Sequence, residues 1–130
     1  MAEARDRLIV ALDFADVGTA RAFVEQVGDS VTFYKVGLEL VLNGGLDLVR
    51  ALKGEGKRVF LDMKLLDIPN TVEKAVANAA RTGADFLTIH AIDTKTIAAA
   101  AKGAAGSDLK VLGVTVLTSL DQNDLAEQGI

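Results

Sequence analysis

Five short apolar runs recur along the chain at nearly constant intervals, and this regularity restricts the possible folds more than any other feature. The runs begin at residues 7, 32, 58, 85 and 110, so successive runs start 25 to 27 residues apart. That interval is the length of one strand followed by one helix. The sequence therefore predicts five strand–helix units, with strands over residues 7–12, 32–37, 58–62, 85–90 and 110–117.

Between the strands, apolar residues follow the 3.6-residue period of amphipathic helices. This spacing predicts helices over residues 20–27, 46–53, 72–80 and 97–105, and a further helix or loop from Asp121. Pro69 suits a first helical turn, and Asn70 with Glu73 three residues later resembles a capping box. Gly103 and Gly106 are expected to end the alanine-rich fourth helix.

Strands that are apolar on both faces and alternate with helices indicate a parallel sheet with right-handed crossovers. Open doubly wound sheets and closed (β/α)8 barrels both satisfy this pattern. The barrel is favoured because it gathers strand ends around one pocket, and each predicted strand ends in polar groups: Asp13, Lys35, Asp62 with Lys64, His90, and Thr115 to Thr118. A complete barrel has about 250 residues. We therefore expect residues 1–130 to form a single domain, an incomplete α/β barrel that supplies strands one to five.

Composition limits the class of protein further. Half of the residues are apolar and a quarter are charged, which is typical of a soluble globular domain. No apolar run approaches the roughly 18 residues of a membrane helix. The absence of cysteine excludes disulfides and fits a reducing compartment. The net charge of −4 argues against nonspecific binding to nucleic acid.

The third strand carries the most reactive combination of side chains. Residues two apart on a strand share a face, so Phe60, Asp62 and Lys64 are expected to point the same way. Lys35 ends the neighbouring strand and can reach the same pocket. Opposite charges that lie close together in one pocket favour each other's ionised forms. Such a pocket holds a lysine that can donate a proton and a carboxylate that can orient an anionic substrate, although a buried structural salt bridge is the alternative.

The remaining polar residues each have a structural alternative. Asp67 and Thr71 could serve only the N-terminus of the helix that follows. Asp13 could bind a sugar hydroxyl or simply face solvent. His90 is expected to be a hydrogen-bonded structural residue.

The sequence contains few of the residue types that bind transition-metal ions. One histidine and no cysteine make a transition-metal centre improbable on composition. A magnesium site on Asp62 and Glu39 stays open as an alternative.

Several strings in the chain resemble one enzyme family. They are Leu12-Asp13, Phe33-Tyr34-Lys35-Val36-Gly37, Asp62-Met-Lys64-Leu-Leu-Asp67-Ile68-Pro69-Asn70-Thr71, Thr88-Ile89-His90-Ala91 and Val114-Thr115-Val116-Leu117-Thr118-Ser119. Together they closely resemble the orotidine 5′-phosphate decarboxylase family, from about Arg7 to the last residue. The D-x-K-x-x-D-I-P-N-T string with the upstream lysine is highly specific.

The resemblance implies a (β/α)8 TIM barrel that dimerises in the cytoplasm. It implies conversion of orotidine 5′-monophosphate to uridine 5′-monophosphate in pyrimidine biosynthesis, with no metal and no organic cofactor. By motif, Lys64 resembles the proton donor and Asp62 the carboxylate beside the departing substrate carboxylate. Lys35 resembles the lysine that completes the charged array and contacts the ribose, and Asp13 resembles a ribose-hydroxyl ligand.

The same resemblance assigns further residues to the site. Asp67, which belongs to the catalytic set, and Thr71 resemble residues that reach into the partner subunit's site. Thr71 and Ile68 belong to the substrate-binding set. Thr118 resembles a substrate contact, and Ser119 beside it is expected to face the base. In such barrels the phosphate usually sits on the loops after strands seven and eight, which these five units do not include.

Two other functions stay open on the sequence. One is a magnesium-dependent sugar-phosphate decarboxylase or aldolase of the same superfamily, against which Lys35 and the I-P-N-T string argue. The other is a truncated half-barrel without catalysis, whose open sheet edges associate with a partner. We expect the 130-residue chain alone to be catalytically silent.

Overall fold

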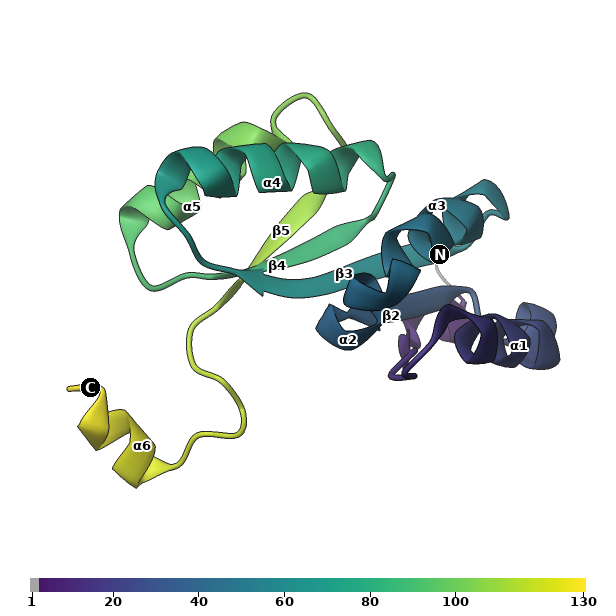
Figure 1. Cartoon of the computed structure of the whole chain (residues 1–130), viewed down its shortest axis with the longest axis horizontal. Helices are drawn as coiled ribbons and strands as arrows, with labels where there is room; N and C mark the ends of the chain where they lie inside the picture. Colours follow the sequence, from purple (N-terminus) through teal and green to yellow (C-terminus); the bar gives the residue numbers. More distant parts are fainter. Residues whose placement is uncertain (1–2) are drawn as a thin grey trace.

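The computed structural model describes residues 3–130 and contains one five-stranded parallel sheet (Figure 1). The strands follow each other in space in the same order as in the sequence. Each strand pairs in parallel register with the next. They are β1 Val10–Ala11, β2 Phe33–Gly37, β3 Arg58–Leu65, β4 Phe86–His90 and β5 Lys110–Val114.

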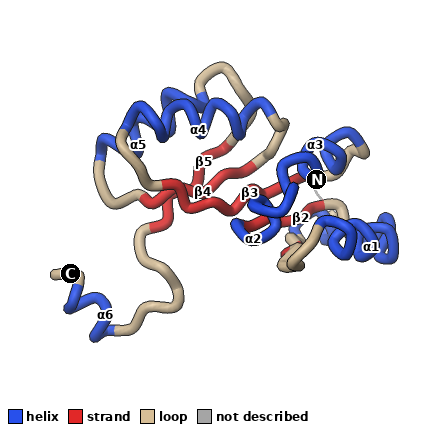
Figure 2. The backbone as a smooth tube through the Cα atoms, viewed as in Figure 1, coloured by secondary structure: helices blue, strands red, loops and turns tan. Residues whose placement is uncertain are grey.

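The helices alternate with the strands, as the apolar periodicity predicts (Figure 2). The four main helices are α1 Val17–Val27, α3 Leu46–Gly54, α4 Pro69–Arg81 and α5 Thr94–Ala104. The shorter elements are η1 Ala4–Arg7, η2 Gly28–Ser30, α2 Leu38–Leu40, η3 Val41–Gly45 and α6 Gln122–Glu127. None of the helices within residues 3–130 is long and apolar enough to cross a membrane.

The main helices pack on one face of the sheet. Alternate residues of the strands form one core with residues of the helices. The strand residues are Tyr34, Val36, Val59, Leu61, Leu87 and Ile89, and the helix residues include Val24, Leu52, Val76 and Ala100. A doubly wound sheet would carry helices on both faces and would reverse its strand order. One-sided packing and consecutive order are instead the pattern of a (β/α)8 barrel wall, which confirms the barrel interpretation over the doubly wound one.

The other face of the sheet carries the residues that would point into a barrel. At its amino end, Arg58 lies over the ring of Phe33 at 4.3 Å and near that of Phe86 at 5.7 Å. Phe60 meets Phe86 edge-on. At its carboxyl end the same face carries Asp62 and Lys64, so the aromatic cluster under Arg58 and this acid–lysine pair occupy opposite ends of one surface.

Some predicted boundaries are wrong in detail. β5 ends at Val114 rather than residue 117, and the chain then runs as a loop to α6, which lies away from the other helices (Figure 1). The predicted Asn70 cap does not form, because Pro69 already occupies the first helical turn and Ile68 is the N-cap residue. Gly103 does not end α5 but lies inside it, where a Cβ atom would collide with the α4 backbone. The glycine instead allows α4 and α5 to approach each other closely.

Asp85, just before β4, joins three elements at the amino end of the sheet. Its carboxylate accepts a hydrogen bond from the Val59 amide at 2.8 Å and lies 2.7 Å from the Lys53 ammonium of α3. Its own amide donates to the Val59 carbonyl at 2.8 Å. We expect Asp85→Ala to lower the free energy of unfolding by about 2 kcal/mol, because a charge-assisted bond is lost and a backbone donor is left without its partner.

Urea unfolding of the protein measures this effect, with Asp47→Ala as the matched control. Asp47 also pairs with a basic residue, Arg50 at 2.9 Å, but both side chains are mostly exposed. An exposed pair of this kind contributes less than about 1 kcal/mol. Equal destabilisation by the two substitutions would contradict the role given to Asp85.

Candidate active site

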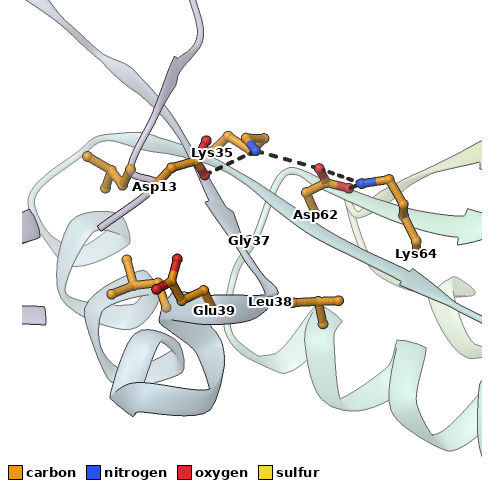
Figure 3. A pocket seen from close by; sticks show the side chains of 9 residues that line it. Asp13, Lys35, Gly37, Leu38, Glu39, Asp62 and Lys64 are labelled. Carbon is orange, nitrogen blue, oxygen red and sulfur yellow. Dashed lines mark hydrogen bonds and ion pairs between the residues drawn. The ribbon is translucent and has the colours of Figure 1, made fainter. Parts of the chain in front are cut away.

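Four charged side chains gather at the carboxyl ends of the first three strands (Figure 3). Asp13 follows β1, Lys35 lies in β2, and Asp62 and Lys64 lie in β3. The parallel register sets Asp62 opposite Gly37, two residues beyond Lys35. Because parallel strands end at the same edge of a sheet, residues far apart in the sequence converge there.

The four side chains form a row of alternating charge. The Lys35 Nζ lies 3.3 Å from an Asp13 carboxylate oxygen and 3.7 Å from Asp62 Oδ2. The Lys64 Nζ donates to both Asp62 oxygens at 2.9 Å. The predicted meeting of Asp62, Lys64 and Lys35 in one pocket is therefore confirmed.

The row favours an ionised Asp62. Burial alone would raise its pKa, since the Asp62 side chain is only 14% exposed. Hydrogen bonds from Lys64 and Thr88, together with the charges of Lys64 and Lys35, outweigh burial and lower the pKa of Asp62 below its usual value. The site thus holds a carboxylate anion against a fixed ammonium.

Two hollows flank the Asp62–Lys64 pair. One, of about 180 Å³, is lined on the β1–β2 side by residues that include Asp13, Lys35 and Glu39. The other, of about 370 Å³, lies on the β4–β5 side and is lined by residues that include Thr118 and Ser119. Since both hollows are open and share the pair, Asp62 and Lys64 are not a sealed structural salt bridge. They can present a proton donor and an anion to a bound molecule.

Three predicted site residues lie away from these hollows. Asp67, Ile68 and Thr71 are exposed in and after the segment that follows β3. An Asp67 carboxylate oxygen accepts the Ile68 amide at 2.6 Å, and Thr71 lies in the first turn of α4. Within this chain they therefore do not approach the Asp62–Lys64 pair closely enough to line its hollows.

The prediction for His90 is wrong in one respect. It lies half-buried at the end of β4, but its ring makes no side-chain hydrogen bond within residues 3–130.

The residues present do not favour a metal site. Across the described part of the chain, no three His, Asp or Glu residues converge in a way that could hold a metal ion. Glu39 lines the same hollow as Asp62. However, the Lys64 and Lys35 ammonium groups occupy the surroundings of the Asp62 carboxylate where a cation would bind. This arrangement fits magnesium poorly.

Thr88 also contacts the pair, although it has no predicted role among the site residues. Its hydroxyl donates to Asp62 Oδ1 at 2.7 Å from the middle of β4. The sequence did contain a signal for this role. Thr88 is a polar residue in an otherwise apolar run, and on a strand it shares a face with the residues two positions before and after it.

The chain is similar in sequence to known proteins. Residues 6–129 match the model of the family described as "Orotidine 5'-phosphate decarboxylase / HUMPS family". The orotidine 5′-phosphate decarboxylase of Bradyrhizobium sp. (strain BTAi1) is 55% identical over 125 residues, which are 96% of this chain and 51% of that protein. The enzyme of the same name from Rhodopseudomonas palustris (strain BisA53) is 55% identical over 127 residues, 98% of this chain and 54% of that protein.

A solved structure gives the same result. The crystal structure of orotidine 5′-phosphate decarboxylase from Lactobacillus acidophilus superposes with a TM-score of 0.85 at 37% identity, over 94% of this chain and 58% of that one. The chain thus spans about half the length of the curated relatives it matches. With a family match over nearly its whole length, the chain belongs to the orotidine 5′-phosphate decarboxylase / HUMPS family.

Proposed function

We propose that this chain supplies the reacting half of an enzyme that decarboxylates orotidine 5′-monophosphate to uridine 5′-monophosphate in pyrimidine biosynthesis, without metal or cofactor. The observation that carries the proposal is the row Asp13, Lys35, Asp62 and Lys64, in which charges alternate at the mouth of the sheet. Two of these residues belong to the D-x-K-x-x-D-I-P-N-T string that resembles the decarboxylases.

The row suits the chemistry of decarboxylation. The bond between the pyrimidine ring and its carboxylate breaks, carbon dioxide leaves, and the electron pair stays on the ring carbon. The fixed Lys64 ammonium stabilises that developing charge and then transfers its proton to the carbon. Lys64 regains a proton from solvent. Asp62, held as an anion, lies beside the departing carboxylate and disfavours the ground state more than the transition state.

Neighbouring residues would hold the rest of the nucleotide. We assign Lys35 and Asp13 to the ribose, since both line the hollow beside Lys64. Thr118 and Ser119 line the hollow on the other side of the pair and are assigned to the base. The phosphate would bind to the part of the barrel beyond these five strands, and its binding energy would hold the reacting end in place.

We propose further that the enzyme is a cytoplasmic homodimer in which Asp67, Ile68 and Thr71 serve the partner's substrate. Support comes from their exposure away from this chain's own hollows. Large apolar side chains are also exposed in the segments that follow β2, β3 and β4: Leu38, Leu42, Leu66, Ile68 and Ile92. Such a concentration around a site is typical of a protein interface. Residues 1–130 would form one incomplete-barrel domain of each subunit.

A sugar-phosphate decarboxylase or aldolase that uses magnesium is the second candidate, since the matched family covers more than one activity. The position of Lys35 argues against it, because its ammonium lies 3.7 Å from the carboxylate that would have to ligate the metal. The third candidate, a half-barrel without catalysis, predicts no turnover in any assembly.

Turnover assays separate these candidates. They require a completed barrel, which we define as residues 1–130 joined to the C-terminal half of the Rhodopseudomonas palustris relative. We expect the completed barrel to consume orotidine 5′-monophosphate and the 130-residue chain alone to be silent. Turnover of a sugar phosphate with added magnesium, in place of the nucleotide, would favour the second candidate.

A further inference from the structure

β3 is irregular at the two residues that carry the proposed chemistry. Leu61 pairs with Leu87 and Leu65 pairs with Ile89, so three residues of β3 oppose the single residue Thr88 of β4. This is a β-bulge, a feature that redirects side chains and is frequent next to active sites. Within the bulge Lys64 has a φ of 47°, and it is the only non-glycine residue with a positive φ among residues 3–130.

Such a conformation persists only where the surrounding structure holds it. An L-residue in the left-handed region is strained, because its Cβ atom comes too close to the backbone carbonyl oxygen that follows. The backbone amide of Lys64 finds no regular ladder partner across the bulge. Instead it donates to the Thr88 hydroxyl oxygen at 3.0 Å. The same hydroxyl donates its proton to Asp62 Oδ1 at 2.7 Å.

One buried hydroxyl therefore binds both members of the pair. Thr88 is 4% exposed, so water does not compete readily for these bonds. A hydroxyl has one proton to donate and lone pairs to accept with. Here the Thr88 hydroxyl donates its proton to the Asp62 carboxylate, and one of its lone pairs accepts the Lys64 amide proton.

We infer that Thr88 is a positioning residue, which holds the Lys64 backbone in its left-handed conformation and fixes the Asp62 carboxylate against the Lys64 ammonium. The inference rests on the proposed function for its effect on turnover. Its structural part, the coupling of Asp62 and Lys64 through one hydroxyl, stands on the contacts alone.

Removal of the hydroxyl should affect both residues. Thr88→Val keeps the shape of the side chain, but it can neither donate to Asp62 nor accept from Lys64. The Lys64 amide then loses the bond that offsets its strained backbone. Asp62 still faces Lys64 and Lys35, with Asp13 and Glu39 lining the same hollow. It loses a bond that lowers its pKa, so the carboxyl should titrate at higher pH.

Thr82 provides the matched control. It is also buried, at 5% exposed, and its hydroxyl also makes two bonds. It donates to the Ala79 carbonyl at 2.6 Å and accepts from the Ala84 amide at 3.2 Å. Thr82 lies at the end of α4, beside the amino end of the sheet and away from the charged row. Thr82→Val thus removes equivalent bonds without contact with the site, and Thr88→Ser restores the hydroxyl at the site.

Two readouts test the inference. In the completed barrel, Thr88→Val should lower kcat by about 100-fold with little change in KM, because a misplaced donor costs about that factor once substrate is bound. Thr88→Ser and Thr82→Val should stay close to the unsubstituted enzyme. In the 130-residue chain, NMR titration of the Asp62 carboxyl should move to higher pH in Thr88→Val and not in Thr82→Val.

The outcomes separate this inference from the proposed function. If the unsubstituted completed barrel has no decarboxylase activity, the proposed function fails, and the Asp62 titration still decides the structural part. If the barrel is active but Thr88→Val matches Thr82→Val in kcat and in the Asp62 titration, the inference about Thr88 is wrong. A kcat loss in Thr88→Val that serine also fails to rescue would likewise overturn it, since the hydroxyl would then not be the active group.

Discussion

Replacing Lys64 with alanine in the completed barrel should reduce turnover of orotidine 5′-monophosphate by about 10⁴-fold or more and leave the fold intact. The factor combines the loss of the proton donor with the loss of a fixed positive charge beside the developing carbanion. Lys64 is partly exposed, and among residues 3–130 its ammonium bonds only to Asp62, so its removal leaves the apolar core in place. Steady-state kinetics and far-UV circular dichroism measure the two halves of this prediction.

Lys102→Ala is the matched control for the loss of a lysine. Lys102 lies in α5, is 74% exposed and pairs with Glu73 at 3.3 Å. Its removal should change neither turnover nor the spectrum. A completed barrel that stays active with alanine at position 64 would contradict the role of Lys64 as proton donor.

Mixing two inactive variants should restore activity if Asp67 serves the partner's site. Asp67→Ala should lower turnover by about 100-fold through the loss of a charged substrate contact. In a heterodimer with Lys64→Ala, one site carries both substitutions and the other carries neither. Random pairing makes half of the dimers mixed, with half of their sites intact, so about a quarter of full activity should return.

A second mixture provides the control. Lys64→Ala mixed with Asp62→Ala should stay inactive, because Asp62 and Lys64 lie together in one subunit and every site then carries one defect. Activity of mixed and separate samples is measured after co-refolding at equal concentration. If the Asp67→Ala mixture stays as inactive as its components, Asp67 acts in its own subunit or not at all.

Much of the fold could be predicted because it depends on local pattern. The 25- to 27-residue interval reflects strand–helix units whose apolar residues must reach one core. Each of the five strands overlaps its predicted range, although β1 and β5 are shorter and β3 is longer than predicted. The segment Leu38–Gly45 escaped prediction because its geometry depends on distant contacts. It breaks the helical path at Asn43 and Gly44, and the Asn43 side chain donates to the Ala15 carbonyl at 2.6 Å.

The site was predictable to the extent that residues two apart on a strand share a face. Asp62 and Lys64 do meet, but through a bulge and a left-handed Lys64 rather than through regular alternation. Sequence spacing cannot reveal a register shift, because it arises from pairing with β4. The bridging role of Thr88 follows from that shift and was missed for the same reason.

The most direct test of this account is the turnover of orotidine 5′-monophosphate by the completed barrel in the presence of a chelator. Product formation is followed by the change in ultraviolet absorbance as the nucleotide loses its carboxylate. The charged row, which has ammonium groups where a metal would bind, predicts equal rates with and without EDTA. A folded barrel that forms no uridine 5′-monophosphate, or one whose activity disappears on chelation and returns with magnesium, would contradict it.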